Sequence, residues 1–469
     1  MAGGVSAALE HLWQLRTGSR TCWWYVKERS LALANCPTAQ PLSLITFTAE
    51  MIDSHYRYCN EFLWPVMHDL PQYAVYRPED REQYDRLNRA LGRCILRWSS
   101  AGDWGNYFVQ DYQLAGLPAE FRRSINARSI VFWHIPWPRA VRGEHLEPVV
   151  ELARKLLLAD GIGFQTEEYA HNFISFLEEN LPEFHWNRDS SSVDWIPGTP
   201  EVNANRQFKV LSGRLRPPES RRVQIIVAPL GLDLEYWRSL ACQHPNTVQH
   251  PALMKTPFVL SVDRADFTKG VTNRIAAIDR FFERYEQWRG RVVFLQVCGQ
   301  SRAGIPTFDI YWDECRMQAA RLNARWASNG WRPLQSTAAH LSSAELALLY
   351  LNASAMLVNP LRDGLNLTAK EYVACQGSPP GVLMLSPYAG AWSELGEYAL
   401  PADPTEPEKM AANLHRALTM GPNEKSMRMC LLQGQLEKNT LSQWCSFFEQ
   451  AVDGDGQTTA LPTFLKDIS

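Results

Sequence analysis

The stretch that decides the fold is ASAMLV, residues 353–358, followed by NPLRDGLNLTAKEY, residues 359–372. The apolar run predicts a buried strand, and LTAKEYVACQ has the composition of a helix. A strand, a glycine-containing loop and a helix start together aim backbone N–H groups and the positive end of a helix dipole at an anion. We interpret the stretch as an anion-binding site, with a solvated turn as the alternative. Its charged and polar residues are Arg362, Asp363, Asn366, Lys370 and Glu371.

Apolar, β-rich segments recur along the whole chain between helix-like stretches. This alternation predicts βαβ units, parallel sheets and therefore an α/β fold. Helical patterns lie at 148–158, 272–288 and 342–352, and the last opens with a Ser-Ser-Ala-Glu capping box. The expected strands are 106–112, 129–135, 161–166, 223–231, 258–264, 291–299, 355–360 and 381–387.

Chemically capable residues fall at the carboxyl ends of these strands, where parallel α/β sheets bind their ligands. We interpret them as one site, against the alternative of five unrelated solvated charges. They are Asp111, His134, Arg264, Arg302 and Asp363.

A second motif, VDRADFTKG at 262–270, places Arg264 at a strand end and Lys269 one short loop later. Two cations at a helix start can clamp a diphosphate, because guanidinium forks onto two oxygens and ammonium acts as a point charge. The alternative is a surface pairing of these cations with Asp263 or Asp266.

The bulk properties set limits on the function. A chain of 469 residues exceeds one ordinary core, so two domains are expected. The net charge of −3 gives no sign of a nucleic-acid partner, and no window is apolar enough for a membrane span. Ten scattered cysteines without metal spacing predict reduced thiols, and the N-terminus lacks a signal-peptide pattern, so we expect a cytoplasmic protein.

The domain organisation is predicted from one interruption in the alternation of strand and helix segments. Residues 186–222 are rich in Ser, Pro, Gly and charge and predict a long loop or small excursion near the end of the first half. The boundaries expected are 1–232, 233–440 and 441–469. Neither a P-loop nor a dinucleotide fingerprint is present, although Gly3 and Gly4 open a small-residue helix that would let the backbone approach a diphosphate.

The chain resembles the trehalose-6-phosphate synthase family of retaining glycosyltransferases. The resemblance implies a GT-B fold, in which two Rossmann-like domains face each other across a cleft and a C-terminal helix, here 442–452, returns to the first domain. The matching stretches run in order along nearly the whole chain: NEFLWPVMHDLPQY (60–73), VQDYQLAGLP (109–118), HIPWP (134–138), GFQTEEYAHNF (163–173), APLGLD (228–233), SVDRADFTKG (261–270), PLRDGLNLTAKEYVACQ (360–376) and GVLMLSPYAGAWSEL (381–395).

The resemblance also implies a role for each matching residue. Arg264 and Lys269 would hold the diphosphate of a nucleotide-glucose donor, most simply UDP-glucose, and Asp363 and His134 would face the sugar. Asp111 would orient the acceptor. The remaining donor-side residues are Gly3, Gly4, Leu365, Asn366, Leu367 and Glu371, the last on the ribose, and the acceptor-side residues are His55, Trp64 and Arg302.

No metal or cofactor is expected. No convincing DxD metal-binding motif precedes the C-terminal tail, and two cations can stabilise the leaving diphosphate in place of a metal. The expected partners are a nucleotide sugar and a sugar phosphate, with functional coupling to a sugar-phosphate phosphatase. A homo-oligomer is left open.

Three departures from the family pattern lie on the acceptor side. The first strand, which normally ends in Asn-Arg, is missing, and we interpret this as a misassigned start rather than a lost element. His55 stands where the family carries a tyrosine for the acceptor phosphate, and Arg139 and Ala140 replace small polar residues near the acceptor mouth.

The acceptor therefore stays open among glucose 6-phosphate, glycerol 3-phosphate and a cyclitol phosphate, as does the nucleotide base. Synthesis of trehalose 6-phosphate is the leading hypothesis. Its rival is a catalytically silent regulatory homologue, but such proteins would be expected to have lost one or more of Arg264, Lys269, Asp363 and Glu371, and all four are present.

Overall fold

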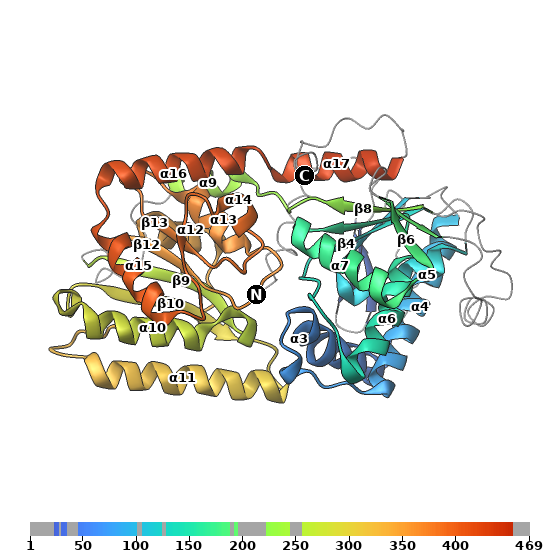
Figure 1. Ribbon diagram of the computed structural model, residues 1–469, viewed down its shortest axis with the longest axis horizontal. Helices are drawn as coiled ribbons and strands as arrows, with labels where there is room; N and C mark the ends of the chain where they lie inside the picture. Colours follow the sequence, from blue (N-terminus) through green and yellow to red (C-terminus); the bar gives the residue numbers. More distant parts are fainter. Residues whose placement is uncertain are drawn as a thin grey trace.

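The computed structural model describes residues 46–100, 106–123, 128–187, 222–243 and 256–453, together with short strands at 23–27, 30–34 and 192–195. In this part of the chain two six-stranded sheets form the centres of two halves that lie side by side (Figure 1). The α/β fold with parallel sheets is thus confirmed. None of the described helices combines the length and the apolar character needed to cross a membrane.

The N-terminal half is built on the sheet β3-β4-β5-β8-β7-β6. Its four parallel strands are β3 (Asn106–Gln110), β4 (Arg128–Trp133), β5 (Gly161–Phe164) and β8 (Arg222–Val227), close to prediction. Two antiparallel edge strands, β6 (Phe184–Asn187) and β7 (Ser192–Trp195), complete it. The start of the stretch predicted as a long loop or small excursion, 186–222, belongs to this edge hairpin, where polar residues alternate with apolar ones.

The C-terminal half is built on an all-parallel sheet in the order β11-β10-β9-β12-β13-β14. The predicted strands are confirmed as β9 (Phe258–Ala265), β10 (Val293–Gln300), β12 (Ala355–Val358) and β13 (Val382–Leu385). All four residues of β12 are buried, which explains why its sequence is uninterrupted and apolar. Prediction missed the edge strands β11 (Leu334–Thr337) and β14 (Leu400–Pro401), which are polar or very short.

Helices cover both sheets, and those predicted from periodicity are confirmed with shifts of a few residues at their ends. The capping box of the 342–352 pattern is present, since Ser342 and Glu345 each bond the backbone of the other. The helices are α2 (Ala49–Arg57), α3 (Trp64–Met67), α4 (Pro78–Ser100), α5 (Leu117–Phe121), α6 (Leu146–Leu156), α7 (Glu167–Asn180), α9 (Leu234–Gln243), α10 (Val271–Arg284), α11 (Pro306–Trp326), α12 (Ser343–Asn352), α13 (Leu367–Cys375), α14 (Trp392–Leu395), α15 (Pro407–Thr419), α16 (Pro422–Glu437) and α17 (Leu441–Asp453).

The last two helices connect the halves, running from α16 on the C-terminal half to α17 on the N-terminal half (Figure 1). Trp444 of α17 is buried and packs against Phe108 of β3 and Phe132 of β4, with ring centroids 5.5 and 5.1 Å apart. Its indole N–H donates to the carbonyl of Ala228 at 3.0 Å. Phe448 adds a stacked contact with Phe108 at 4.6 Å. Helix α17 is thus anchored on the N-terminal sheet and, through α16, connects it to the C-terminal half.

A buried charge reinforces this connection. The ammonium of Lys370 is fully buried, pairs with Glu394 at 2.5 Å and donates to the carbonyl of Leu230 at 2.9 Å. Because both partners are protein groups, Lys370 is a structural residue between the halves. Counting it among the anion-binding residues of 359–372 was wrong, since it points away from the loop.

The cysteines within the described residues are free, and five of them are buried. Burial raises the pKa of Cys298 and of Cys315 to about 12, so both remain protonated thiols. These eight residues agree with the predicted reduced state, while Cys22 and Cys36 lie outside the described residues.

Replacing Trp444 by alanine removes a fully packed indole from this junction. We expect Trp444→Ala to lower the free energy of unfolding by about 3 kcal/mol, as for other large core truncations. Calorimetric unfolding measures it, with Ser442→Ala on the exposed side of α17 as the control. If both variants had the same free energy of unfolding, the packing of α17 would not stabilise the junction between the halves.

Candidate active site

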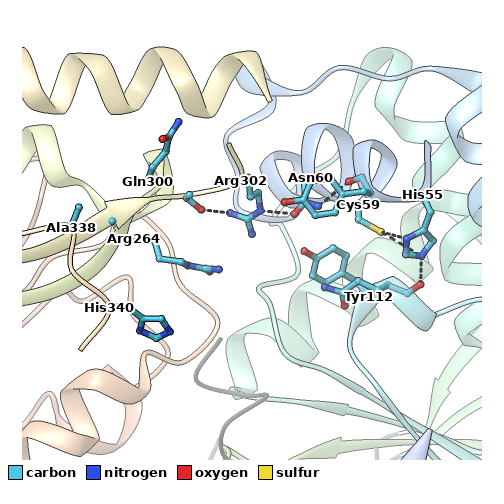
Figure 2. A pocket seen from close by; sticks show the side chains of 13 residues that line it. His55, Cys59, Asn60, Tyr112, Arg264, Gln300, Arg302, Ala338 and His340 are labelled. Carbon is cyan, nitrogen blue, oxygen red and sulfur yellow. Dashed lines mark hydrogen bonds between the residues drawn. The ribbon is translucent and has the colours of Figure 1, made fainter. Parts of the chain in front are cut away.

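A cavity of about 550 Å³ lies between the two halves (Figure 2). Its wall in the C-terminal half comes from the carboxyl ends of three adjacent strands, β9, β10 and β11. Its wall in the N-terminal half comes from α2, the π-helical turn Tyr58–Leu63 and the 3₁₀ turn Tyr112–Leu114. The lining residues are His55, Tyr56, Cys59, Asn60, Tyr112 and Gln113 on one side and Arg264, Gly299, Gln300, Ser301, Arg302, Ala338 and His340 on the other.

The two arginines of the cavity differ in their surroundings. Arg264 extends from the end of β9 into the cavity, and among the described residues its guanidinium has no ion pair (Figure 2). Arg302 is held by Asp266 at 2.5 Å and Asn60 at 2.5 Å, and its guanidinium carbon lies 4.1 Å from the ring centre of Trp64. Arg264 is therefore the cation most open to a new anion, while Arg302 bridges the halves.

The VDRADFTKG loop is organised by its carboxylates. Asp263 pairs with the buried Arg274, and Asp266 accepts from the backbone and hydroxyl of Thr268 as well as from Arg302. Burial alone would raise the pKa of Asp266, but the nearby cations, Arg302 first, lower it to about 2. Both carboxylates have other partners, so the alternative of a surface pairing with Arg264 and Lys269 was wrong.

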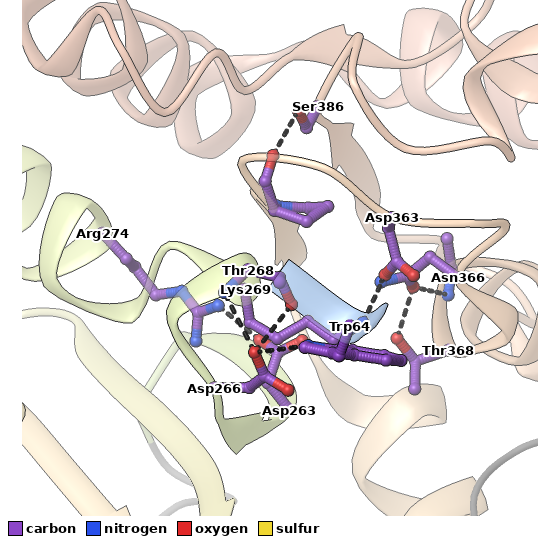
Figure 3. Close-up of polar contacts among 12 residues, drawn as sticks. Trp64, Asp263, Asp266, Thr268, Lys269, Arg274, Asp363, Asn366, Thr368 and Ser386 are labelled. Atoms are coloured by element: carbon purple, nitrogen blue, oxygen red, sulfur yellow. Dashed lines mark hydrogen bonds and ion pairs between the residues drawn. The ribbon is translucent and has the colours of Figure 1, made fainter. Parts of the chain in front are cut away.

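Lys269 instead joins the second motif. Its ammonium lies 2.5 Å from Oδ2 of Asp363, and the amide of Asn366 donates to the same oxygen at 2.9 Å (Figure 3). Burial would raise the pKa of Asp363, yet the Lys269 charge and these hydrogen bonds outweigh it and hold the pKa below its usual value. Oδ2 thus has two donors, which leaves Oδ1 available to a ligand.

The loop between β12 and α13 approaches the other half closely. A Cβ on Gly364 would lie 1.9 Å from the carbonyl oxygen of His134, so only glycine fits there. Asn366 adopts a left-handed φ of 82° and caps α13 by accepting from the N–H of Ala369 at 3.2 Å. The first N–H groups of α13 have no intrahelical acceptors, and that of Ala369 is taken by Asn366, so the remaining ones match the usual arrangement of a helix start that binds anions.

Glu371 lies in the first turns of α13 and is buried. The hydroxyl of Tyr350 donates to its Oε2 at 2.9 Å. Burial raises the pKa of Glu371 to about 7, and this hydrogen bond opposes the rise only in part. The carboxyl can therefore change its charge near neutral pH.

Asp111 follows β3 with a left-handed φ of 68°, a strained conformation typical of functional turns. Its Oδ1 accepts from the N–H groups of Tyr112 at 3.0 Å and His134 at 3.2 Å. Burial raises the pKa of Asp111 to about 7.

His134 is buried and neutral, because burial lowers its pKa to about 3. Gln165 donates to its Nδ1 at 3.0 Å, so its Nε2 carries the proton and donates to Gln110 at 2.8 Å. The tautomer is fixed because the carbonyl oxygen of Gln165 already accepts from the N–H of Leu230.

His55 lines the cavity, as its position in the acceptor prediction requires. Its Nε2 lies 3.0 Å from the carbonyl of Gln113, and its ring stacks on Tyr84 with centroids 5.2 Å apart. Burial lowers the pKa of His55, so Nε2 donates to Gln113 and Nδ1 is left as an acceptor. Nδ1 lies 3.9 Å from the thiol of Cys59, so the neutral ring has no N–H left to donate to a phosphate.

Of the predicted site residues in the described part of the chain, His55, Arg264 and Arg302 line the cavity. The others do not line it: Trp64, Asp111, His134, Lys269, Asp363, Leu365, Asn366, Leu367 and Glu371. Arg139 is exposed, pairs with Glu168 at 3.2 Å and does not line the cavity, and its place near the acceptor mouth stays a prediction. Arg362 also faces Glu168, at 2.9 Å, rather than an open anion site. Gly3 and Gly4 lie outside the described residues, so their predicted part in the site stays a prediction.

Sequence reasoning missed several cavity residues. His340 follows β11, whose polar sequence LQST gave no strand signal, so no strand end was expected there. Asn60 and Asp266 stood inside the quoted motifs, yet nothing in their spacing indicated that they would fix Arg302. Within the described residues, no three His, Cys, Asp or Glu side chains gather in a way that could hold a metal ion.

Comparison with known proteins identifies the family. The glycosyltransferase family 20 profile matches residues 29–453. A trehalose-6-phosphate synthase of Sinorhizobium fredii is 30% identical over 456 residues, which cover 95% of this chain and 93% of that protein. The bifunctional trehalose-6-phosphate synthase/phosphatase of Thermoproteus tenax is 31% identical over 87% of this chain, which spans only 53% of that longer relative.

A solved structure gives the same answer. The UDP-forming alpha,alpha-trehalose-phosphate synthase of Burkholderia xenovorans in complex with glucose-6-phosphate is 26% identical, with a TM-score of 0.80 and 97% of each chain covered. The profile match, the relatives and the shared fold agree, and the chain belongs to glycosyltransferase family 20.

Proposed function

We propose that this protein is a retaining glucosyltransferase that moves glucose from UDP-glucose to glucose 6-phosphate, giving trehalose 6-phosphate and UDP. The observation that carries the proposal is the arrangement of Arg264, Lys269 and Asp363 at and after the ends of two adjacent parallel strands, with Arg264 lining a cavity between the halves. The names of the relatives, one of them bound to glucose-6-phosphate, support the choice of substrates.

On the donor side, Arg264 and Lys269 would bind the diphosphate with the N-terminal end of α13 beyond them. As the bond from the diphosphate to the sugar carbon breaks, negative charge grows on the leaving oxygen, and fixed cations stabilise it without reorganisation. The Leu365, Asn366 and Leu367 backbone would face the phosphates. Glu371 would accept from the ribose hydroxyls.

The sugar would lie against Asp363 and His134. Asp363 keeps its charge and one free oxygen, so it can accept from two sugar hydroxyls. Because His134 is neutral and surrounded by amides, it contributes orientation and exclusion of water rather than proton transfer.

On the acceptor side, the phosphate would meet Arg302 beside Trp64, with His55 at the far wall. Asp111 would orient the attacking hydroxyl. Attack from the face that the diphosphate leaves forms the new carbon–oxygen bond, and the hydroxyl proton passes to the leaving phosphate oxygen. Retention of configuration then needs no protein nucleophile.

The two cations proposed at the diphosphate and the phosphate carried by the product lead to two further expectations. With two cations at the diphosphate, we propose that turnover requires no metal. The product carries a phosphate that a phosphatase would remove, and the bifunctional Thermoproteus relative joins both activities in one chain.

A matrix of donors and acceptors tests the proposed function. UDP-, ADP- and GDP-glucose are each combined with glucose 6-phosphate and glycerol 3-phosphate, and nucleotide release is measured before and after exhaustive chelation. We expect the highest turnover for UDP-glucose with glucose 6-phosphate, undiminished by chelation. No release with any pair would contradict a transferase role and favour the regulatory alternative, and loss on chelation would contradict metal independence.

Substituting Arg264 tests the diphosphate clamp. Arg264→Ala should lower kcat/KM by about 100-fold, equivalent to about 3 kcal/mol, the usual effect of losing one donor to a developing anion. Steady-state kinetics measures it against Arg316→Ala, an exposed position on α11. Full turnover of Arg264→Ala would show that the clamp is assigned to the wrong residue.

The raised pKa of Glu371 predicts a pH dependence of donor binding. UDP-glucose itself does not titrate near neutrality, and Asp363 and His134 keep their charge states there. Glu371 is ionised above about pH 7 and accepts best from ribose in that form, so affinity should fall several-fold from about pH 8 to about pH 6. Calorimetric titration measures this.

The matched variant is Glu371→Gln, which cannot titrate and should bind equally across that range. A flat profile for the unmodified protein would remove Glu371 from the ribose site. A slope that persists in Glu371→Gln would assign the titration to another group.

A further inference from the structure

Tyr169 reaches across the cleft to the donor loop. It lies on α7 of the N-terminal half, and its hydroxyl donates to the backbone carbonyl of Asp363 at 2.7 Å. The ring is buried, and burial raises the pKa of Tyr169, so the hydroxyl stays protonated as a donor. The same carbonyl also accepts from the N–H of Gly390 at 3.1 Å, within the C-terminal half. Asp363 is thus anchored from both halves.

Arg362 makes the neighbouring contacts. Its guanidinium carbon lies 5.2 Å from the ring centre of Tyr169, and it pairs with Glu168 at 2.9 Å and Asp69 at 3.6 Å. All three partners belong to the N-terminal half. Together with the close passage of Gly364 over the His134 carbonyl, these contacts dock the loop 360–366 on the opposite half.

The nucleotide contacts proposed above need no such docking. Arg264 and Glu371 both stand on the C-terminal half, at the end of β9 and in α13. A movement of one half away from the other would leave these groups in place. It would break the Tyr169 bond and release the backbone of Asp363, whose Oδ1 would face the sugar.

We propose that Tyr169 is a positioning residue that makes recognition of the donor sugar, but not of its nucleotide, depend on the docked arrangement of the two halves. This inference rests on the proposed function, because it takes Asp363 to be the sugar-binding carboxylate. Tyr169 acts on the sugar only through the backbone of Asp363. Its removal should therefore affect UDP-glucose more than UDP.

Tyr169→Phe tests this, because phenylalanine keeps the ring beneath Arg362 and removes only the hydroxyl. Calorimetric titration with UDP-glucose and with UDP gives the ratio of the two affinities. We expect that ratio to fall about fivefold in Tyr169→Phe, the usual effect of one buried hydrogen bond, with UDP affinity unchanged. The donor KM should rise in the same proportion.

Tyr84→Phe is the matched control. Tyr84 is also buried and donates to a backbone carbonyl, that of Tyr112, at 2.7 Å, but it does so within the N-terminal half. Its loss should affect thermal stability to a similar degree and leave the UDP-glucose to UDP ratio unchanged. If lower stability alone changed the ratio of UDP-glucose affinity to UDP affinity, the ratio would change in both variants. If Tyr169 positions Asp363, the ratio changes only in Tyr169→Phe.

The outcomes separate the two claims. Suppose that the unmodified protein turns over its substrates, but the ratio of UDP-glucose affinity to UDP affinity in Tyr169→Phe is the same as in the unmodified protein, whether both affinities are kept or both fall equally. That result would overturn the positioning role and leave the proposed function intact. Absence of wild-type turnover with every donor and acceptor would overturn the proposed function and this inference with it.

Discussion

The ion pair between Lys269 and Asp363 is the interaction on which the site depends. It joins the loop after β9 to the loop after β12, two segments far apart in the sequence that adjacent parallel strands bring together. Both groups are largely buried, so each would be costly alone, and their pairing keeps a carboxylate charged where burial would otherwise neutralise it. The neighbouring contacts of Asn366 and Tyr169 then fix the direction in which that carboxylate points.

The two walls of the cavity differ in chemical freedom. On the C-terminal wall Arg264 has no ion pair among the described residues. Asp363, which belongs to the same half but does not line the cavity, keeps one free oxygen. On the N-terminal wall His55 is neutral and bonded to Gln113, while Arg302 shares its charge with Asp266. This contrast agrees with the proposed roles of the halves. The C-terminal half would bind the donor with fixed charges, and the N-terminal half would select the acceptor by shape and hydrogen bonds.

Much of this could be predicted from the sequence, because the signals were local. The apolar run of β12, the glycine of the following loop and the helical composition of LTAKEYVACQ are all short-range signals, so strand, loop and helix were predicted in place. The positions of Arg264, Lys269 and Asp363 at strand ends followed from the parallel topology.

The direction of individual side chains could not be predicted in this way. Lys370 and Arg362 have the composition of an anion site, yet Lys370 points to the carbonyl of Leu230 and Arg362 to Glu168 across the cleft. The edge strand β11 was too polar to be recognised, so His340 went unnoticed. In each case the cause is a tertiary contact that no periodicity in the sequence records.

The most direct test of the central claim is a crystal structure of the protein with UDP-glucose bound. The account predicts the diphosphate within hydrogen-bond distance of Arg264 and Lys269, a sugar hydroxyl on Oδ1 of Asp363 and the ribose on Glu371. A nucleotide sugar bound elsewhere, or one in this cleft whose diphosphate contacts neither cation, would contradict it.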